Sequence, residues 1–85
     1  MESSVIDNPM ASRFEIFVDE ERVGTLSYER SEETIALADI ETDVRLAGQG
    51  LGLTLVRHAL DAAAAEGLSV LPVSSFVRDF IERHR

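Results

Sequence analysis

The fold is decided by residues 43–57, which read Asp-Val-Arg-Leu-Ala-Gly-Gln-Gly-Leu-Gly-Leu-Thr-Leu-Val-Arg. Three glycines in this stretch, Gly48, Gly50 and Gly52, separate an apolar strand-like run from an apolar helical run. A chain that turns through glycines into a helix directs several unpaired backbone N–H groups to one point, and the helix dipole adds partial positive charge there. That combination binds phosphate groups. The sequence therefore predicts an anion site at this turn. The alternative is a tight strand-to-helix turn without a ligand.

The residues after the turn predict a helix, a short strand and a second helix. Between residues 50 and 66, apolar side chains recur at three- and four-residue spacing, which indicates a helix with one buried face. Gly67 is a candidate for its C-terminal cap. Residues 68–73 predict a strand that separates from its neighbour at Pro72, because proline has no N–H to donate. Ser74 and Ser75 then cap a last helix over residues 76–84.

The residues before the turn predict three antiparallel strands. Residues 13–18 and 23–30 alternate apolar and polar side chains, and residues 34–41 place apolar groups on both faces. Residues 1–12 are polar and aperiodic, so we expect a flexible N-terminal tail. The predicted fold is α+β in the order β-β-β-α-β-α. It contains a mixed sheet with an antiparallel meander and one parallel strand pair joined across the first helix.

The composition limits the classes of function. A chain of 85 residues with 45 % apolar residues makes one domain with a packed core. A net charge of −8 argues against nucleic acid or an anionic membrane as partner, and no apolar run approaches the length of a membrane span. The absence of cysteine and the presence of only two histidines argue against a metal site. With no visible secretory signal, we expect a cytoplasmic protein that is a monomer or weak dimer.

Known phosphate-binding patterns can be compared with the turn. The chain is too short for the two halves of a Rossmann domain, and it lacks the Gly-Lys-Ser/Thr of a P-loop. The spacing Arg45-x-x-Gly48-x-Gly50 instead matches the pyrophosphate-binding signature of the GCN5-related N-acetyltransferases, Arg/Gln-x-x-Gly-x-Gly/Ala. Residues 13–84 resemble a small, truncated branch of that family, whose members bind CoA.

The resemblance to the truncated branch rests on four short stretches. Residues 39–42, Asp-Ile-Glu-Thr, stand where the branch has His-Thr-Glu-Val, and residues 47–52 match its Arg-Gly-x-Gly-Ile/Leu-Gly. Residues 72–77 match Pro-Leu-Cys-x-Phe/Tyr-Val, and Arg83-His84 matches the Arg-His end of the last helix. Three positions depart from the pattern. Ala47 replaces an arginine, Asp39 a histidine, and Ser74 the candidate catalytic cysteine.

The resemblance implies that residues 13–85 form an acyl-CoA-binding domain with acetyl-CoA as cofactor. Its pantetheine arm would pair with the edge of the third predicted strand. The implied cofactor-binding residues are Arg45, Leu46, Ala47, Gly48, Gln49, Gly50, Leu51, Gly52 and Thr54, with the amides of residues 46–52 donating to the phosphates. Arg45 would replace the arginine lost at Ala47.

The resemblance also implies a reaction, the transfer of an acetyl group from acetyl-CoA to an amine. Glu41 would be the general base, and Asp39 is a second, weaker candidate. Ser74 occupies the position of the family's cysteine, but no neighbouring histidine in the sequence activates it. Amides near Val73 would polarise the thioester carbonyl.

Short turns between the strands and the acidic surface favour a cationic amine on a protein or peptide as acceptor. A non-catalytic CoA-binding module is the first alternative, since the family's cysteine and histidine are missing. A structural domain that has lost the cofactor is the second.

Overall fold

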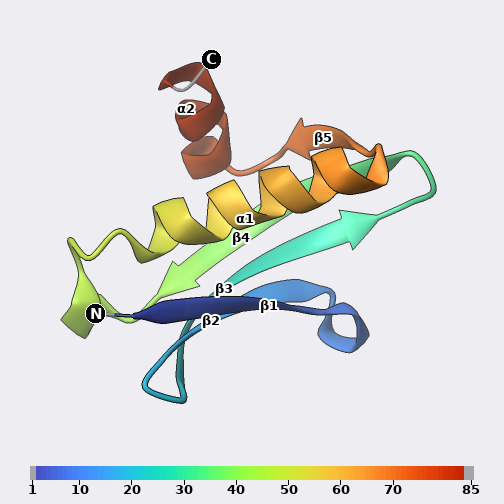
Figure 1. Ribbon diagram of the computed structural model, residues 1–85. Coiled ribbons are helices and arrows are strands. Elements are labelled where there is room, and N and C mark those ends of the chain that lie inside the picture. The colour runs from blue at the N-terminus through green and yellow to red at the C-terminus, as the bar shows by residue number, and fades with distance from the viewer. Residues whose placement is uncertain (1, 84–85) are drawn as a thin grey trace.

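The computed structural model describes residues 2–83 and contains a five-stranded sheet with a long helix lying across it (Figure 1). The strands are β1 (Ser3–Asn8), β2 (Arg13–Val18), β3 (Glu21–Arg30), β4 (Thr34–Thr42) and β5 (Ser69–Pro72), and they are neighbours in that order. The helices are α1 (Leu51–Glu66) and α2 (Ser75–Arg83), with short 3-10 turns at Pro9–Ala11 and Val44–Leu46. All strand pairs are antiparallel except β4–β5, which is parallel. The predicted α+β fold with one parallel pair is confirmed.

The first strand, β1, lies where the sequence predicts a flexible tail, and that prediction is wrong for residues 3–8. β1 pairs with β2 along its whole length. The Tyr28 hydroxyl on β3 donates a hydrogen bond of 2.6 Å to Asp7 of β1, and burial together with this bond raises the pKa of Tyr28 to about 12. Backbone pairing and contacts with distant residues therefore stabilise this strand, although its sequence does not alternate apolar and polar residues.

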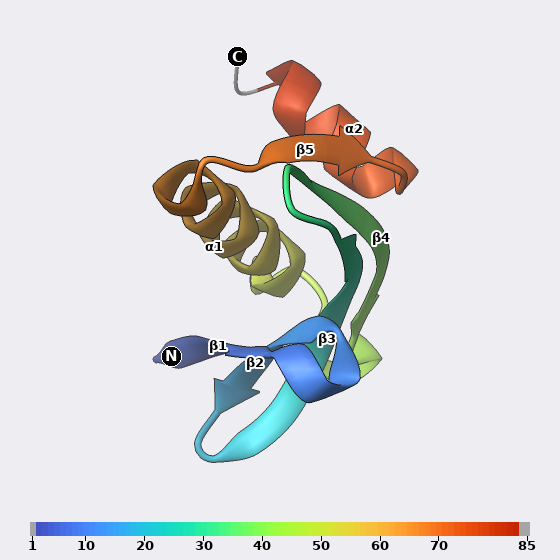
Figure 2. The same ribbon diagram turned by 90° about the vertical axis from the view of Figure 1, so that its right-hand side faces the viewer.

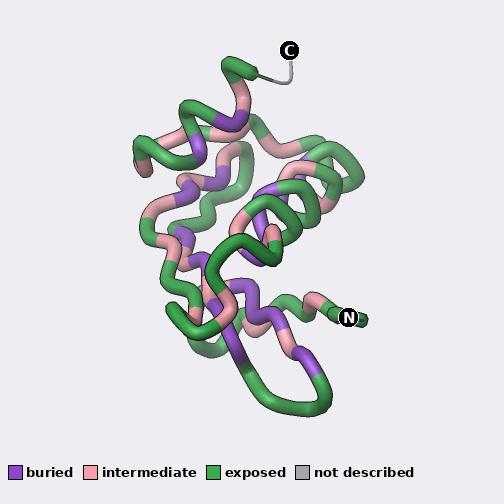
Figure 3. The backbone as a smooth tube through the Cα atoms, turned by 90° about the vertical axis from the view of Figure 1, so that its left-hand side faces the viewer, coloured by how far each residue is buried: buried purple, intermediate pink, exposed green. Residues whose placement is uncertain are grey.

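The core lies between the sheet and α1. Figure 3 shows the buried positions along the middle strands and on the inner side of α1. α1 begins directly after Gly50 and ends at Gly67, whose amide donates to the carbonyls of Ala63 and Ala64. The predicted C-terminal cap is thus confirmed. The buried residues of α1 are Leu51, Leu55, Val56, Ala59 and Ala63.

The parallel pair is short, and the two strands then separate. β5 pairs with β4 only over Thr34–Leu37, ending where Leu37 faces Pro72. β4 continues to Thr42, while the chain after β5 turns into α2 (Figure 2). The separation predicted at Pro72 is confirmed. The Ser74 hydroxyl oxygen accepts a hydrogen bond of 3.2 Å from the Phe76 amide and so caps α2. His84, the predicted end of this helix, lies outside the described residues.

Candidate functional site

A cleft of about 860 Å³ opens where β4 and β5 separate. Its walls come from the second half of β4, from the glycine turn with the start of α1, and from the segment that leads into α2. The lining residues are Ala38, Asp39, Ile40, Thr42, Leu46, Ala47, Gly48, Gly50, Leu51, Gly52, Leu53, Val73, Ser74, Ser75 and Phe76. Most of the predicted cofactor-binding turn therefore lines one cleft.

Two glycines shape the turn through their backbone conformation. Gly48 and Gly50 have φ angles of +86° and +77°, a region that other L-residues adopt at a cost. A Cβ at either position would meet nothing within 4 Å, so both side-chain directions are open. Gly50 is also the N-cap of α1, and it supplies no side-chain cap. The turn therefore brings bare backbone to the start of the helix.

The amides of the turn fall into two groups. Those of Leu46, Ala47 and Gln49 donate within the chain, to the carbonyls of Asp43, Val44 and Leu46. Five other amides of the turn and the start of α1 have no hydrogen-bond partner among the described residues: Gly48, Gly50, Leu51, Gly52 and Leu53. The sequence predicts donors over residues 46–52, whereas the unpartnered donors begin at Gly48 and extend to Leu53. These five amides and the helix dipole make the turn attractive to an anion.

Arg45 does not line the cleft. Its guanidinium is bonded to Asp43, with Nε–Oδ distances of 3.0 and 3.1 Å, and it lies 3.4 Å from a Glu21 oxygen. Hydrogen bonds from Arg45 lower the pKa of Asp43 to about 2, and Asp43 in turn raises the pKa of Arg45. The prediction that Arg45 meets the phosphates is therefore not supported by the position of its side chain.

A bulge in β4 lies at the apex of the cleft. Leu26 of β3 faces Ile40 and Tyr28 faces Leu37, so Ala38 and Asp39 together stand opposite the single residue Ser27. The Ser27 hydroxyl accepts a bond of 3.1 Å from the Asp39 amide and makes a longer one, of 3.4 Å, to the Asp39 carbonyl. Asp39 is the one charged residue among those that line the cleft within the described chain.

Glu41 and Thr54 lie outside this cleft. Glu41 lines a shallower cavity of about 310 Å³ with residues 22–25 of β3, two positions beyond Asp39 on β4. The Thr54 hydroxyl donates to the Gly50 carbonyl at 3.0 Å, and Thr54 lines a second cavity along α1. Glu41 and Ser74, which stands at the position of the family's candidate catalytic cysteine, therefore line different cavities.

Ser74 lines the cleft, but the backbone around it is already bonded. The amides of Val73 and Ser74 both donate to the Leu37 carbonyl, at 3.1 and 3.2 Å. Of the amides near Val73 that were predicted to polarise a thioester carbonyl, those of Val73 and Ser74 are therefore already occupied. The Ser74 hydroxyl oxygen caps α2, and no histidine lines the cleft within the described residues.

Asp39 and Phe76 line the cleft, although the sequence made Asp39 only a weaker candidate and assigned Phe76 no role in the site. A bulge changes which residues reach the cleft, and no sequence pattern marks this one, because it depends on the register between β3 and β4. Phe76 rests on Gly52, where a Cβ would lie 3.0 Å from its ring. Its ring is 41 % exposed and forms part of the wall. The sequence offers only a weak signal for this contact, a glycine at position 52 within the predicted helix. Spacing along the chain does not show that the distant Phe76 packs against it.

The described residues contain no group of three or more histidine, cysteine or acidic side chains arranged to hold a metal ion. Neither helix in that part of the chain combines the length and apolar character needed to cross a membrane.

Comparisons with known proteins agree with this geometry. The family model described as GCN5-related N-acetyl-transferase matches residues 13–85. Two similar solved structures are those of an aminoglycoside acetyltransferase, meta-AAC0020, from an uncultured soil metagenomic sample, one in complex with sisomicin and one with trehalose. Both have a TM-score of 0.66, at 19 % and 20 % identity, over 86 % of this chain.

The chain spans only 55 % of the length of those two proteins, and at this identity the likeness concerns the fold. A comparison with curated protein sequences found no match. The family model covers most of the sequence and includes the glycine turn. The chain therefore belongs to the GCN5-related N-acetyltransferase family.

Proposed function

We propose that this chain binds acetyl-CoA in the cleft between β4 and β5 and transfers its acetyl group to an amine. The observation that carries the proposal is the set of five unpartnered amides from Gly48 to Leu53, whose residues line the same cleft as the open edge of β4. A diphosphate accepts several N–H donors at once, and helix N-termini are common sites for it. Membership of the family adds support, because the family's general cofactor is acetyl-CoA.

The open edge of β4 suits the rest of the cofactor. β5 stops pairing at Leu37, so within the described chain no strand covers the outer edge of β4 from Ala38 to Thr42. The pantetheine arm carries two amide groups, and it can pair with such an edge as a peptide does. With the diphosphate on the turn, the thioester would extend toward the apex of the cleft, near Asp39 and Ser74.

Asp39 is the group best placed to act on the acceptor amine. The amine arrives as an ammonium ion and gives one proton to the Asp39 carboxylate, and its nitrogen then attacks the thioester carbonyl. The C–N bond forms, the C–S bond breaks, and the departing thiolate takes the second proton from nitrogen. Glu41 was the sequence-based candidate for this role, but it lines a different cavity.

The acceptor class follows from charge and access. The net charge of −8 and the carboxylate at the apex favour a cationic amine. Only a two-residue turn joins β2 to β3, so no helix between these strands closes over the sheet. An amine on a protein or peptide suits such an open arrangement, and we propose this acceptor class.

A non-catalytic CoA-binding module is the second candidate. It is favoured by the occupied amides of Val73 and Ser74, because neither of these two donors is free to stabilise a developing oxyanion. The two candidates share the cofactor site and differ only in turnover.

Two measurements separate the candidates. Isothermal titration calorimetry with acetyl-CoA tests the cofactor site, and no heat of binding at millimolar ligand would reject both readings. Release of free CoA thiol in the presence of lysine-containing peptides, above the rate without peptide, then supports the enzyme. Binding without any peptide-dependent release supports the module.

A further inference from the structure

A second cavity, of about 480 Å³, continues from the cleft along the outer side of α1. It shares Gly50 and Leu53 with the cleft, so the two form one surface around the start of the helix. Its other lining residues are Gln49, Thr54, Arg57, His58 and Asp61. Two of these, Arg57 and His58, can carry positive charge, whereas the cleft itself contains no basic residue.

Arg57 differs from the four arginines that form ion pairs in the described chain, and from Arg78, which donates to the Pro72 carbonyl at 3.4 Å. Arg13 and Arg22 bond to Glu15, Arg30 to Glu66, and Arg45 to Asp43. Arg57 has no carboxylate partner within the described residues, and its guanidinium lies 6.0 Å from the centre of the Phe80 ring. An aromatic ring at this distance orients a guanidinium while leaving its N–H donors available. In a chain of net charge −8, an unpaired arginine over a cavity marks a place for an anion.

The spacing between this arginine and the turn suits a second phosphate. Arg57 lies seven positions after Gly50 along the helix, a rise of about 10 Å. Helix side chains tilt toward the N-terminus, which brings a long side chain closer to the turn than its Cα. CoA carries a phosphate monoester on its ribose, one sugar ring away from the diphosphate. The molecule thus presents two anionic groups a short distance apart.

We infer that Arg57 binds the ribose 3′-phosphate of CoA, and that this second cavity is the site where the chain distinguishes CoA from dephospho-CoA. The inference rests on the proposed function, since it takes the diphosphate to lie on the glycine turn. The guanidinium presents two N–H donors to the phosphate oxygens. Asp61 lies one helical turn beyond Arg57 and lines the same cavity, so its carboxylate opposes the phosphate and limits the affinity.

The test compares CoA with dephospho-CoA, which lacks only the ribose phosphate, in calorimetric titrations of the full chain. The wild-type protein should bind CoA about tenfold more tightly, the usual size of one charge-assisted contact. Arg57→Ala should reduce this ratio to near one by weakening CoA binding and leaving dephospho-CoA binding unchanged. Asp61→Asn should change CoA binding in the opposite direction.

Arg30→Ala is the matched control, because it removes the same charge near the far end of α1, where Arg30 contacts Glu66. It should preserve the wild-type ratio. A wild-type ratio near one, or an equal loss of both ligands in Arg57→Ala at unchanged thermal stability, would overturn the inference while leaving the cofactor proposal intact. Failure of both ligands to bind the wild-type protein would instead reject the proposed function. A further supporting result would be that millimolar inorganic phosphate weakens the binding of CoA but not that of dephospho-CoA.

Discussion

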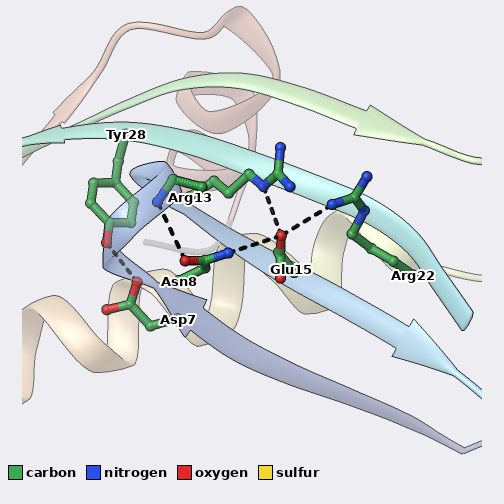
Figure 4. A network of polar contacts seen from close by, with 7 residues as sticks. Asp7, Asn8, Arg13, Glu15, Arg22 and Tyr28 are labelled. Carbon is green, nitrogen blue, oxygen red and sulfur yellow. Dashed lines mark hydrogen bonds and ion pairs between the residues drawn. The ribbon is translucent and has the colours of Figure 1, made fainter. Parts of the chain in front are cut away.

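Two polar regions of this small protein differ in whether their hydrogen-bonding groups have partners within the chain. On β2, the residue Glu15 is only 5 % exposed, and one of its carboxylate oxygens accepts bonds from Asn8, Arg13 and Arg22 (Figure 4). At the glycine turn, five consecutive or nearly consecutive amides have no partner within the described chain. The first region satisfies a buried charge, whereas the second keeps its donors available.

This difference separates a structural role from a binding role. A buried carboxylate is tolerated only when donors surround it, and the donors here join β1, β2 and β3. Unpartnered amides at a helix start cost little while water solvates them, and they bind an anion that displaces the water. Changes in the Glu15 cluster should therefore act on stability, and changes in the turn should act on ligand affinity.

The largest expected effect is that of Gly50→Glu. It places a carboxylate at the phosphate site and a non-glycine residue at a φ of +77°. We expect the affinity for acetyl-CoA to fall at least about 100-fold in calorimetry, because the new charge repels the phosphates and the strained turn no longer presents its amides in the same geometry. Gly67→Glu is the control, since Gly67 has a φ of +70° and open space around it at the other end of α1. Equal losses in the two variants would show that the effect is one of folding.

A change at Asp39 should come next in size and should affect turnover only. Asp39→Asn keeps the side-chain shape but removes the proton acceptor, so kcat should fall about 100-fold while acetyl-CoA affinity stays within twofold. Glu41→Gln removes the neighbouring carboxylate of β4, which lines another cavity, and should leave kcat nearly unchanged. A larger loss in Glu41→Gln than in Asp39→Asn would restore Glu41 as the base.

Glu15→Gln tests the structural side of the comparison. Losing the charged acceptor should lower the free energy of unfolding by about 1–3 kcal/mol, without changing acetyl-CoA affinity. The Arg13 hydrogen bond, with those from Asn8 and Arg22, holds the pKa of Glu15 below its usual 4.5 in the folded state. The carboxylate therefore stabilises the fold above pH 4.5, and this stabilisation is lost as the pH falls through the lower, folded-state pKa.

Urea unfolding at several pH values between 3 and 6 measures how the free energy of unfolding depends on pH. The wild-type protein should lose stability on acidification, and Glu15→Gln should lose less over the same range. Parallel curves for the two proteins would mean that other carboxylates control the acid sensitivity.

The smallest expected effect is that of Arg45→Ala. The family signature assigns this arginine to the phosphates, but its guanidinium is bonded to Asp43 and is largely exposed. We expect acetyl-CoA affinity to change less than threefold, since Arg45 does not line the cleft, and protein stability to change little, since exposed ion pairs contribute little. A tenfold loss would show that Arg45 leaves Asp43 when the cofactor binds.

Much of the fold could be predicted because its elements are locally marked. The three- and four-residue spacing of α1, the cap at Gly67 and the missing N–H of Pro72 each depend on a few neighbouring residues. β1 could not be predicted in this way, because it is held by pairing with β2 and by the Tyr28–Asp7 bond.

In the candidate site, too, the features that depend on neighbouring residues could be predicted, whereas those that depend on tertiary structure could not. The glycine turn was visible in the sequence, since positive φ angles require glycine. The bulge at Asp39 was not visible, because it depends on how β3 aligns with β4. Which amides of the turn are already bonded also depends on the three-dimensional path of the chain, since a sequence pattern lists donors without their partners.

The most direct test of the central claim is a titration of 15N-labelled protein with acetyl-CoA, followed through the backbone amide shifts. The account predicts that the amides of Gly48, Gly50, Leu51, Gly52 and Leu53 show the largest downfield proton shifts, because they gain phosphate acceptors, while those of Leu46, Ala47 and Gln49 move less. Saturable binding that leaves these five amides unmoved would contradict the account.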